Sequence, residues 1–169
     1  MKLMRRINIQ VDIQIAVEDE SIPKSGDIIL WINRAFQLSG CNSEAEVSVR
    51  IVDEVEMQKL NVKYRDQDKP TNILSFPADL IDGLPHDMQL FLGDIVICAE
   101  IVRREAEEQN KTASDHWAHM LVHGMLHLLG FDHINESDAA VMENLEIQIM
   151  TNHGIANPYG EPPRRPDTL

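Results

Sequence analysis

The stretch HGMLHLLGFDH, residues 123–133, contains three histidines and a glycine whose spacing decides how one helix ends. In an α-helix His123 and His127 project from the same face, because residues four apart lie one turn from each other. Gly130 falls where the helix should end, and glycine accepts the left-handed conformation of a helix C-terminal cap. The chain can then double back and bring His133 toward the first two histidines.

Three imidazoles gathered in this way indicate a metal site. Three nitrogen ligands leave one coordination position open, which is typical of catalytic rather than structural zinc. Two histidines four residues apart often arise by chance, but a third histidine beyond a turn-forming glycine is much harder to obtain accidentally. We therefore predict that His123, His127 and His133 bind one Zn²⁺, although nitrogen ligands alone do not decide the metal.

Two further histidines lie earlier in the same predicted helix. His119 and His127 are eight residues apart, roughly 12 Å along a helix axis, so they cannot bind the same ion. We predict that His116 and His119 pack or form hydrogen bonds on the same helix face.

Gly124 stands where the metzincin zinc proteases, which share the spacing HxxxHxxGxxH, carry a glutamate that acts as general base. Glycine has no proton acceptor, so the protease mechanism loses its central group. A glycine here could instead let a strand or helix approach the histidine helix closely. Zinc can lower the pKa of a bound water to about 7, which predicts a metal retained for a different reaction.

Hydrophobic periodicity predicts one α+β domain over residues 1–155, with a small mixed four-stranded sheet, about five helices and a metal site at the end of a central helix. This arrangement would be distantly metzincin-like. The predicted strands are 6–15, 46–52, 73–78 and 92–99, and the predicted helices are 27–38, 53–64, 99–109, 114–129 and 137–151.

Three smaller expectations follow from the same patterns. The last predicted helix places Val141, Leu145 and Ile149 on one apolar stripe, which should face the core. Residues 79–89 read as a loop or hairpin tip. Residues 156–169 are rich in proline and polar side chains, and we expect a flexible tail.

The composition is that of a cytoplasmic globular protein. The 169 residues are 43% hydrophobic and 25% charged, no apolar run approaches the roughly 20 residues that span a bilayer, and the N-terminus lacks the pattern of a signal peptide. Cys41 and Cys98 lie far apart without a CxxC pattern. We read them as reduced thiols, and a single disulfide between them stays open.

The formal net charge of −13 argues against a protein that coats nucleic acid through bulk electrostatics. One local exception is the run from Lys63 to Lys69, which includes Arg65. Arginine is suited to gripping a phosphate through two parallel hydrogen bonds. By composition alone, however, this stretch reads as a solvated loop.

Three motifs together resemble the YbeY family of metal-dependent endoribonucleases, which are bacterial rRNA maturation factors: RDQDKPTNILSFP (65–77), GDIVIC (93–98) and HMLVHGMLHLLGFDH (119–133). The resemblance runs from about residue 46 to Tyr159. It implies that the three histidines bind the metal and that Arg65 is functionally important. It also implies single-strand-specific cleavage, maturation of the 3′ end of small-subunit rRNA, and ribosome quality control.

On this basis we expect one Zn²⁺ to act as Lewis acid and to activate water, with Arg65 and His123 as the catalytic residues. Arg65 would stabilise charge on the phosphoryl oxygens, and Lys63 and Lys69 would bind the RNA backbone. Asp132 could orient a ligand imidazole or cap the turn. The general base and the chemistry of the product ends stay open.

The expected partners are single-stranded RNA, especially rRNA, and the small ribosomal subunit with its proteins, with no membrane and no DNA. Two rival functions stay open. One is a non-catalytic, zinc-containing ribosome-assembly factor. The other is a metalloprotease that recruits its base from elsewhere, which Gly124 disfavours.

Overall fold

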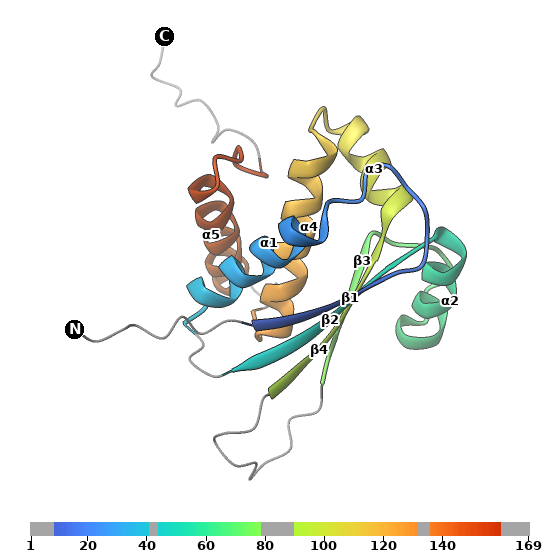
Figure 1. The fold of residues 1–169 in the computed structure, drawn as a ribbon, viewed down its shortest axis with the longest axis horizontal. Coiled ribbons are helices and arrows are strands. Elements are labelled where there is room, and N and C mark those ends of the chain that lie inside the picture. The colour runs from blue at the N-terminus through green and yellow to red at the C-terminus, as the bar shows by residue number, and fades with distance from the viewer. Residues whose placement is uncertain (1–8, 41–43, 79–89, 132–135, 160–169) are drawn as a thin grey trace, which may run out of the picture.

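The computed structural model describes residues 9–40, 44–78, 90–131 and 136–159, which form a four-stranded sheet and five helices (Figure 1). In chain order the elements are β1 (Ile9–Ile15), α1 (Ser25–Leu38), β2 (Ala45–Val52), α2 (Glu54–Arg65), β3 (Ile73–Pro77), β4 (Leu90–Cys98), α3 (Ala99–Glu108), α4 (Ala113–Leu128) and α5 (Glu136–Asn152). This order confirms the predicted α+β class. The loop predicted at 79–89 lies outside the described residues.

The sheet has the strand order β1-β2-β4-β3. β1, β2 and β4 run parallel to one another, and β3 pairs antiparallel with β4 at the edge of the sheet. The mixed four-stranded sheet is therefore confirmed. Figure 1 shows α1, α4 and α5 together over one face, with α2 on the other side of the sheet.

The main core lies between the sheet and α1, α4 and α5. Alternate side chains of a strand point to opposite faces, so Val47, Val49 and Ile51 of β2 are all fully buried against these helices. One face of α1 is buried with them, and it includes Ile32 and Phe36. These contacts hold the helices firmly on one face of the sheet.

A smaller core lies on the opposite face, under α2. Met57 of α2 packs there against Val96 and Cys98 of β4. Cys98 is a buried thiol, and burial raises its pKa. Cys41 lies outside the described residues.

The helix α4 is the central helix of the domain and is capped at both ends. Thr112 accepts a hydrogen bond from the backbone N–H of Asp115 at the start. At the end, the N–H of Gly130 donates to the carbonyl of His127 and the N–H of Phe131 donates to that of Leu126. These two bonds form a Schellman motif, which requires the positive φ of +97° at Gly130.

The prediction that Val141, Leu145 and Ile149 face inward on α5 is partly wrong. Ile149 is buried, but Val141 is 53% exposed. The inward face instead carries Met142 and Glu146, together with Met150. An apolar stripe cannot reveal this face, because a carboxylate occupies its centre and is held there by hydrogen bonds from two histidines of α4.

Within the described part of the chain, no helix is both long and apolar enough to cross a membrane. After α5 the chain is held to the connection between α3 and α4 by Lys111, whose ammonium donates to the carbonyl of Pro158 at 2.7 Å. The predicted tail therefore begins with a segment that contacts the domain as far as Tyr159. Residues 160–169 lie outside the described residues.

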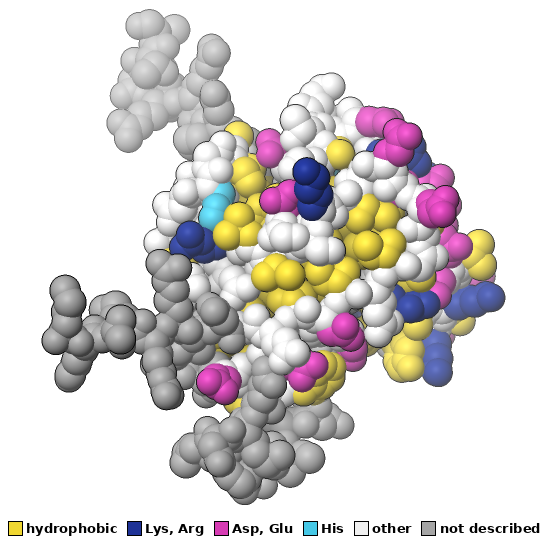
Figure 2. Space-filling view, viewed as in Figure 1, with side chains coloured by type: hydrophobic (Ala, Val, Ile, Leu, Met, Phe, Trp, Pro, Cys, Tyr) yellow, Lys and Arg dark blue, Asp and Glu magenta, His cyan; other side chains and the backbone are white. Residues whose placement is uncertain are grey.

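The surface is not uniformly acidic. Figure 2 shows basic side chains over the region where Figure 1 places α2, with acidic side chains gathered above them. Lys63 and Arg65 are the basic residues in the last turn of α2. A local basic region thus exists in a chain whose net charge is −13.

Candidate active site

Two of the three predicted metal ligands face each other at the end of α4. The Nε2 atoms of His123 and His127 are 3.2 Å apart, and both side chains are half-buried. Two nitrogens bound to one tetrahedral Zn²⁺ at roughly 2.0–2.1 Å would be separated by about 3.3 Å. The pair therefore fits one ion. His133, like Asp132, lies outside the described residues.

A buried carboxylate stands behind this pair. Glu146 of α5 accepts a hydrogen bond from Nδ1 of His123 at 2.6 Å and from Nε2 of His119 at 2.7 Å. The hydroxyl of Tyr159 donates to the same carboxylate. Burial raises the pKa of Glu146, but these hydrogen bonds outweigh it and lower the pKa to about 2, so the group is ionised.

The ligand atoms of His119, His123 and Glu146 lie within 4.8 Å of one another, so this group could also hold a metal ion. The prediction that His119 forms hydrogen bonds is confirmed by its contact with Glu146. The same holds for His116, whose Nε2 lies 3.0 Å from a carboxylate oxygen of Glu105. Burial is the main reason that the pKa of His119 is lowered.

Gly124 allows α4 and β3 to touch. A Cβ atom at this position would lie 2.8 Å from Cδ1 of Ile73 and 3.2 Å from Oγ of Ser75. The hydroxyl of Ser75 donates to the carbonyl of Gly124 at 3.0 Å, which joins the strand to the helix. The prediction that this glycine serves close packing is confirmed, and a glutamate at the metzincin position would collide with β3.

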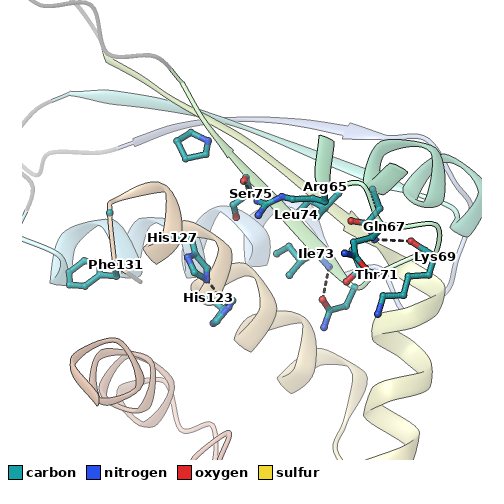
Figure 3. Close-up of a pocket in the computed structure, with 14 residues that line it drawn as sticks. Arg65, Gln67, Lys69, Thr71, Ile73, Leu74, Ser75, His123, His127 and Phe131 are labelled. Carbon is teal, nitrogen blue, oxygen red and sulfur yellow. Dashed lines mark hydrogen bonds between the residues drawn. The ribbon is translucent and has the colours of Figure 1, made fainter. Parts of the chain in front are cut away.

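A cleft of about 680 Å³ opens in front of the histidine pair (Figure 3). Its described lining comes from the end of α2, the following loop, β3 and the end of α4: Asn61, Arg65, Gln67, Lys69, Thr71, Asn72, Ile73, Leu74, Ser75, Pro77, His123, His127, Gly130 and Phe131. Among these residues the only formal charges at pH 7 are the cations Arg65 and Lys69. The described lining therefore favours an anionic ligand.

The guanidinium of Arg65 lies alongside the edge strand. Its Nη2 donates to the carbonyl of Ser75 at 3.2 Å, and Figure 3 shows the side chain extending from α2 toward β3. Arg65 ends α2, and Asp66 then takes the left-handed conformation with φ of +55°. The arginine therefore stands on a defined helix end rather than on an unstructured loop, and it lines the same cleft as the histidine pair.

The loop after α2 is also held in place from both sides. The buried Asn61 donates to the carbonyl of Lys69 at 2.8 Å. Asn72 donates to the carboxylate of Glu105 and accepts from the N–H of Ile73. These hydrogen bonds give the asparagines at either end of this polar stretch a structural role, although the composition of the stretch alone predicts a solvated loop.

The predicted site residues fall into three groups. Arg65, Lys69, His123 and His127 line one cleft, and His133 lies outside the described residues. Lys63 is on the last turn of α2 but not among the described lining residues, and its ammonium lies 5.1 Å from the ring centre of Tyr64.

The sequence patterns do not single out Asn61, Glu146 or Tyr159. Asn61 sits on a helix of low apolar content, and Glu146 and Tyr159 are distant in sequence from the histidines that they support. An acidic residue within an apolar face was the one available signal, and it pointed only to Glu146.

The structure resembles the solution structure of the Thermotoga maritima protein TM1509, with a TM-score of 0.53 over 93% of this chain and 99% of that one, at 23% identity. Residues 12–154 match the sequence profile of the family described as Endoribonuclease YbeY. A protein of Colwellia psychrerythraea named Endoribonuclease YbeY is 44% identical over 153 residues, which cover 89% of this chain and 97% of that protein. The chain belongs to the YbeY endoribonuclease family.

The contact at Gly124 predicts the effect of restoring the metzincin glutamate. Gly124→Glu should lower the free energy of unfolding by roughly 1–3 kcal/mol or more, because the new side chain overlaps Ile73 and Ser75. Urea unfolding followed by circular dichroism measures the change. Gly26→Glu is the matched control, because nothing lies within 4 Å of a Cβ there. Equal unfolding midpoints for wild type and Gly124→Glu would contradict the packing role.

Proposed function

We propose that this protein is a single-strand-specific, zinc-dependent endoribonuclease that processes ribosomal RNA. The observation that carries the proposal is the cleft, where two half-buried histidines and two cations face the same space in a chain of net charge −13. Membership of the endoribonuclease family supplies the class of reaction. The cleft supplies the groups that such a reaction needs.

His123 and His127, with His133, would hold the metal. The 3.2 Å separation of the two Nε2 atoms supports this assignment, as does the carboxylate on Nδ1 of His123, which is the usual partner of a metal-binding imidazole. A bound Zn²⁺ would supply Lewis acidity and activate water for attack on phosphorus. The donor set of imidazole nitrogens suits zinc, although it accepts other transition metals.

Arg65 and Lys69 would bind the RNA backbone. A phosphodiester gains negative charge on its oxygens as it is attacked, and a fixed guanidinium stabilises this charge without reorganisation. Lys69 would hold a neighbouring phosphate, and Lys63, outside the described lining, would steer the approaching strand. The side chain of His123 is only 21% exposed, which favours a flexible single strand over a rigid duplex.

The edge of β3 argues against a peptide substrate, which would most simply add as a further strand. The backbone groups of Asn72 and Ala78 form hydrogen bonds with β4. The backbone N–H and C=O groups of the alternate residues Ile73, Ser75 and Pro77 therefore point away from the sheet, toward its open edge. The N–H of Ile73 already donates to the Asn72 side chain, and the carbonyl of Ser75 accepts from Arg65. Pro77 has no N–H, so strand addition finds few partners.

The acidic surface favours a basic protein partner over tight binding of naked RNA. A net charge of −13 repels phosphates everywhere except near the basic cleft. We propose that the protein works in the cytoplasm on the small ribosomal subunit, where it matures the 3′ end of the small-subunit rRNA and removes defective ribosomes. A basic ribosomal protein would then hold the enzyme near its substrate.

The metal site is tested by measuring zinc content by elemental analysis and cleavage of single-stranded RNA on the same preparations. Wild type should contain about one zinc per chain and cleave RNA, and His127→Ala should lose both. His153→Ala is the control, because His153 lies by Arg34 and Asn152 in a separate small pocket. If His127→Ala lost the metal but kept full cleavage, the histidines would not form the nuclease centre. The cleavage would then come from another site or from a contaminant, and a contaminant would favour the assembly-factor alternative.

The role of Arg65 is tested by Arg65→Ala. We expect kcat for RNA cleavage to fall roughly 10²-fold or more, the size of losing one transition-state donor, while zinc content stays unchanged. Lys59→Ala on the same helix removes an exposed cation outside the described lining and should have little effect. Unchanged cleavage by Arg65→Ala with zinc still bound would refute the role.

The proposed partner is tested by comparing cleavage rates on purified small-subunit rRNA and on intact small subunits, at the same RNA concentration and salt. We expect faster cleavage on the subunit, because docking to a basic ribosomal protein offsets repulsion by the acidic surface. Equal rates on both substrates would rule out a contribution from a protein partner.

A further inference from the structure

The carboxylate of Glu146 is fully buried and accepts hydrogen bonds unequally on its two oxygens. Among the described residues, Oε1 faces only Nδ1 of His123, whereas Oε2 faces both Nε2 of His119 and the hydroxyl of Tyr159. A buried charge is retained only where such donors compensate for its lost hydration. The three donors come from α4 and from the segment after α5, so Glu146 joins distant parts of the chain.

This arrangement decides where His123 carries its proton. An ionised carboxylate only accepts hydrogen bonds, so Nδ1 of His123 must be protonated. In a neutral imidazole the lone pair then lies on Nε2, the atom that is 3.2 Å from Nε2 of His127. A metal binds the unprotonated nitrogen of an imidazole. Glu146 thus selects the tautomer in which His123 presents a lone pair toward His127.

Tyr159, which donates to Glu146, lies in the segment that follows α5. The ammonium of Lys111 donates to the carbonyl of Pro158, and the N–H of Tyr159 donates to the side chain of Asn157. The phenol ring packs edge-on against His119, with ring centres 5.4 Å apart. Tyr159 lies beyond residues 12–154, which match the family profile.

We propose that Glu146, secured by Tyr159 and His119, is a positioning residue that fixes His123 in its metal-binding tautomer and is not itself a metal ligand. The proposal rests on the proposed function, in which His123 and His127 share the ion. The alternative is an ion within the group of His119, His123 and Glu146. Two observations count against this alternative. The nitrogens of His119 and His123 already form hydrogen bonds with Glu146, at 2.7 and 2.6 Å, and the side chain of Glu146 is not exposed.

Glu146→Gln tests the tautomer, because glutamine keeps the shape and presents one acceptor and one donor. The amide oxygen should take the side that faces two donors, His119 and Tyr159, so the amide NH₂ should face His123. Nδ1 of His123 must then accept, and its proton moves to Nε2. We expect ¹⁵N NMR of the metal-free protein to report this change of tautomer, which a loss of packing alone would not produce.

Titration with Zn²⁺ against a chelator gives the second measurement. Glu146→Gln should still bind about one zinc per chain at saturation, with a Kd raised about 10–100-fold. Tyr159→Phe removes only one donor to Oε2, so its Kd should rise by less, and this variant serves if Glu146→Gln fails to fold. Tyr64→Phe removes a hydroxyl from an exposed tyrosine on α2 and should leave the Kd unchanged.

Three results would overturn the proposal: an unchanged tautomer in Glu146→Gln, an unchanged Kd in both Glu146→Gln and Tyr159→Phe, or zinc lost from Glu146→Gln and His119→Gln but kept by His127→Ala. The last result would place the ion in the buried group. Failure of the proposed function is separate, because it would appear as a wild type that neither binds zinc nor cleaves RNA. The tautomer measurement needs neither metal nor RNA.

Discussion

The close approach of α4 to β3 at Gly124 is the contact on which the site depends. The strand carries Ser75 and the outward carbonyl that Arg65 binds, and the helix carries both histidines. With any Cβ at position 124, the helix would have to move away from Ile73 or displace its side chain. A single missing side chain thus brings an arginine from α2 and two imidazoles from α4 to the same cleft.

The same contact explains why a site with metzincin-like histidine spacing lacks the metzincin base. A glutamate after the first histidine needs room on the side of the helix that β3 occupies here. The carboxylate of this site lies instead behind His123, on α5, where it bonds to the ring rather than facing the cleft. A carboxylate in that position can orient the imidazole of His123.

The charge of the described cleft lining is opposite in sign to the net charge of the chain. Acidic side chains dominate the whole molecule, while Arg65 and Lys69 face the cleft. Hydrogen bonds from Asn61 and Asn72 hold the loop that carries Lys69, so these cations have defined positions. In the proposed function, this distribution would favour binding of one phosphate segment at the cleft and disfavour RNA elsewhere. This is consistent with a selective processing enzyme rather than a protein that coats RNA.

The sequence by itself determined the local features of this protein. The order of elements, the buried stripe of α1, the helix end at Gly130 and the pairing of His123 with His127 all follow from periodicity and backbone preferences. Motif resemblance, rather than spacing, added Arg65 and the class of reaction, because a basic loop has the same composition whether or not it binds RNA.

Only the tertiary structure decided what stands around the histidines. Glu146 faces inward although its helix predicts a different inward stripe, and Tyr159 reaches it from a segment read as a flexible tail. Both depend on hydrogen bonds between residues far apart in sequence, and periodicity reports only which side chains share a face. Burial of a charge depends on donors that the folded chain brings to it, so the partners of a carboxylate emerge only from packing.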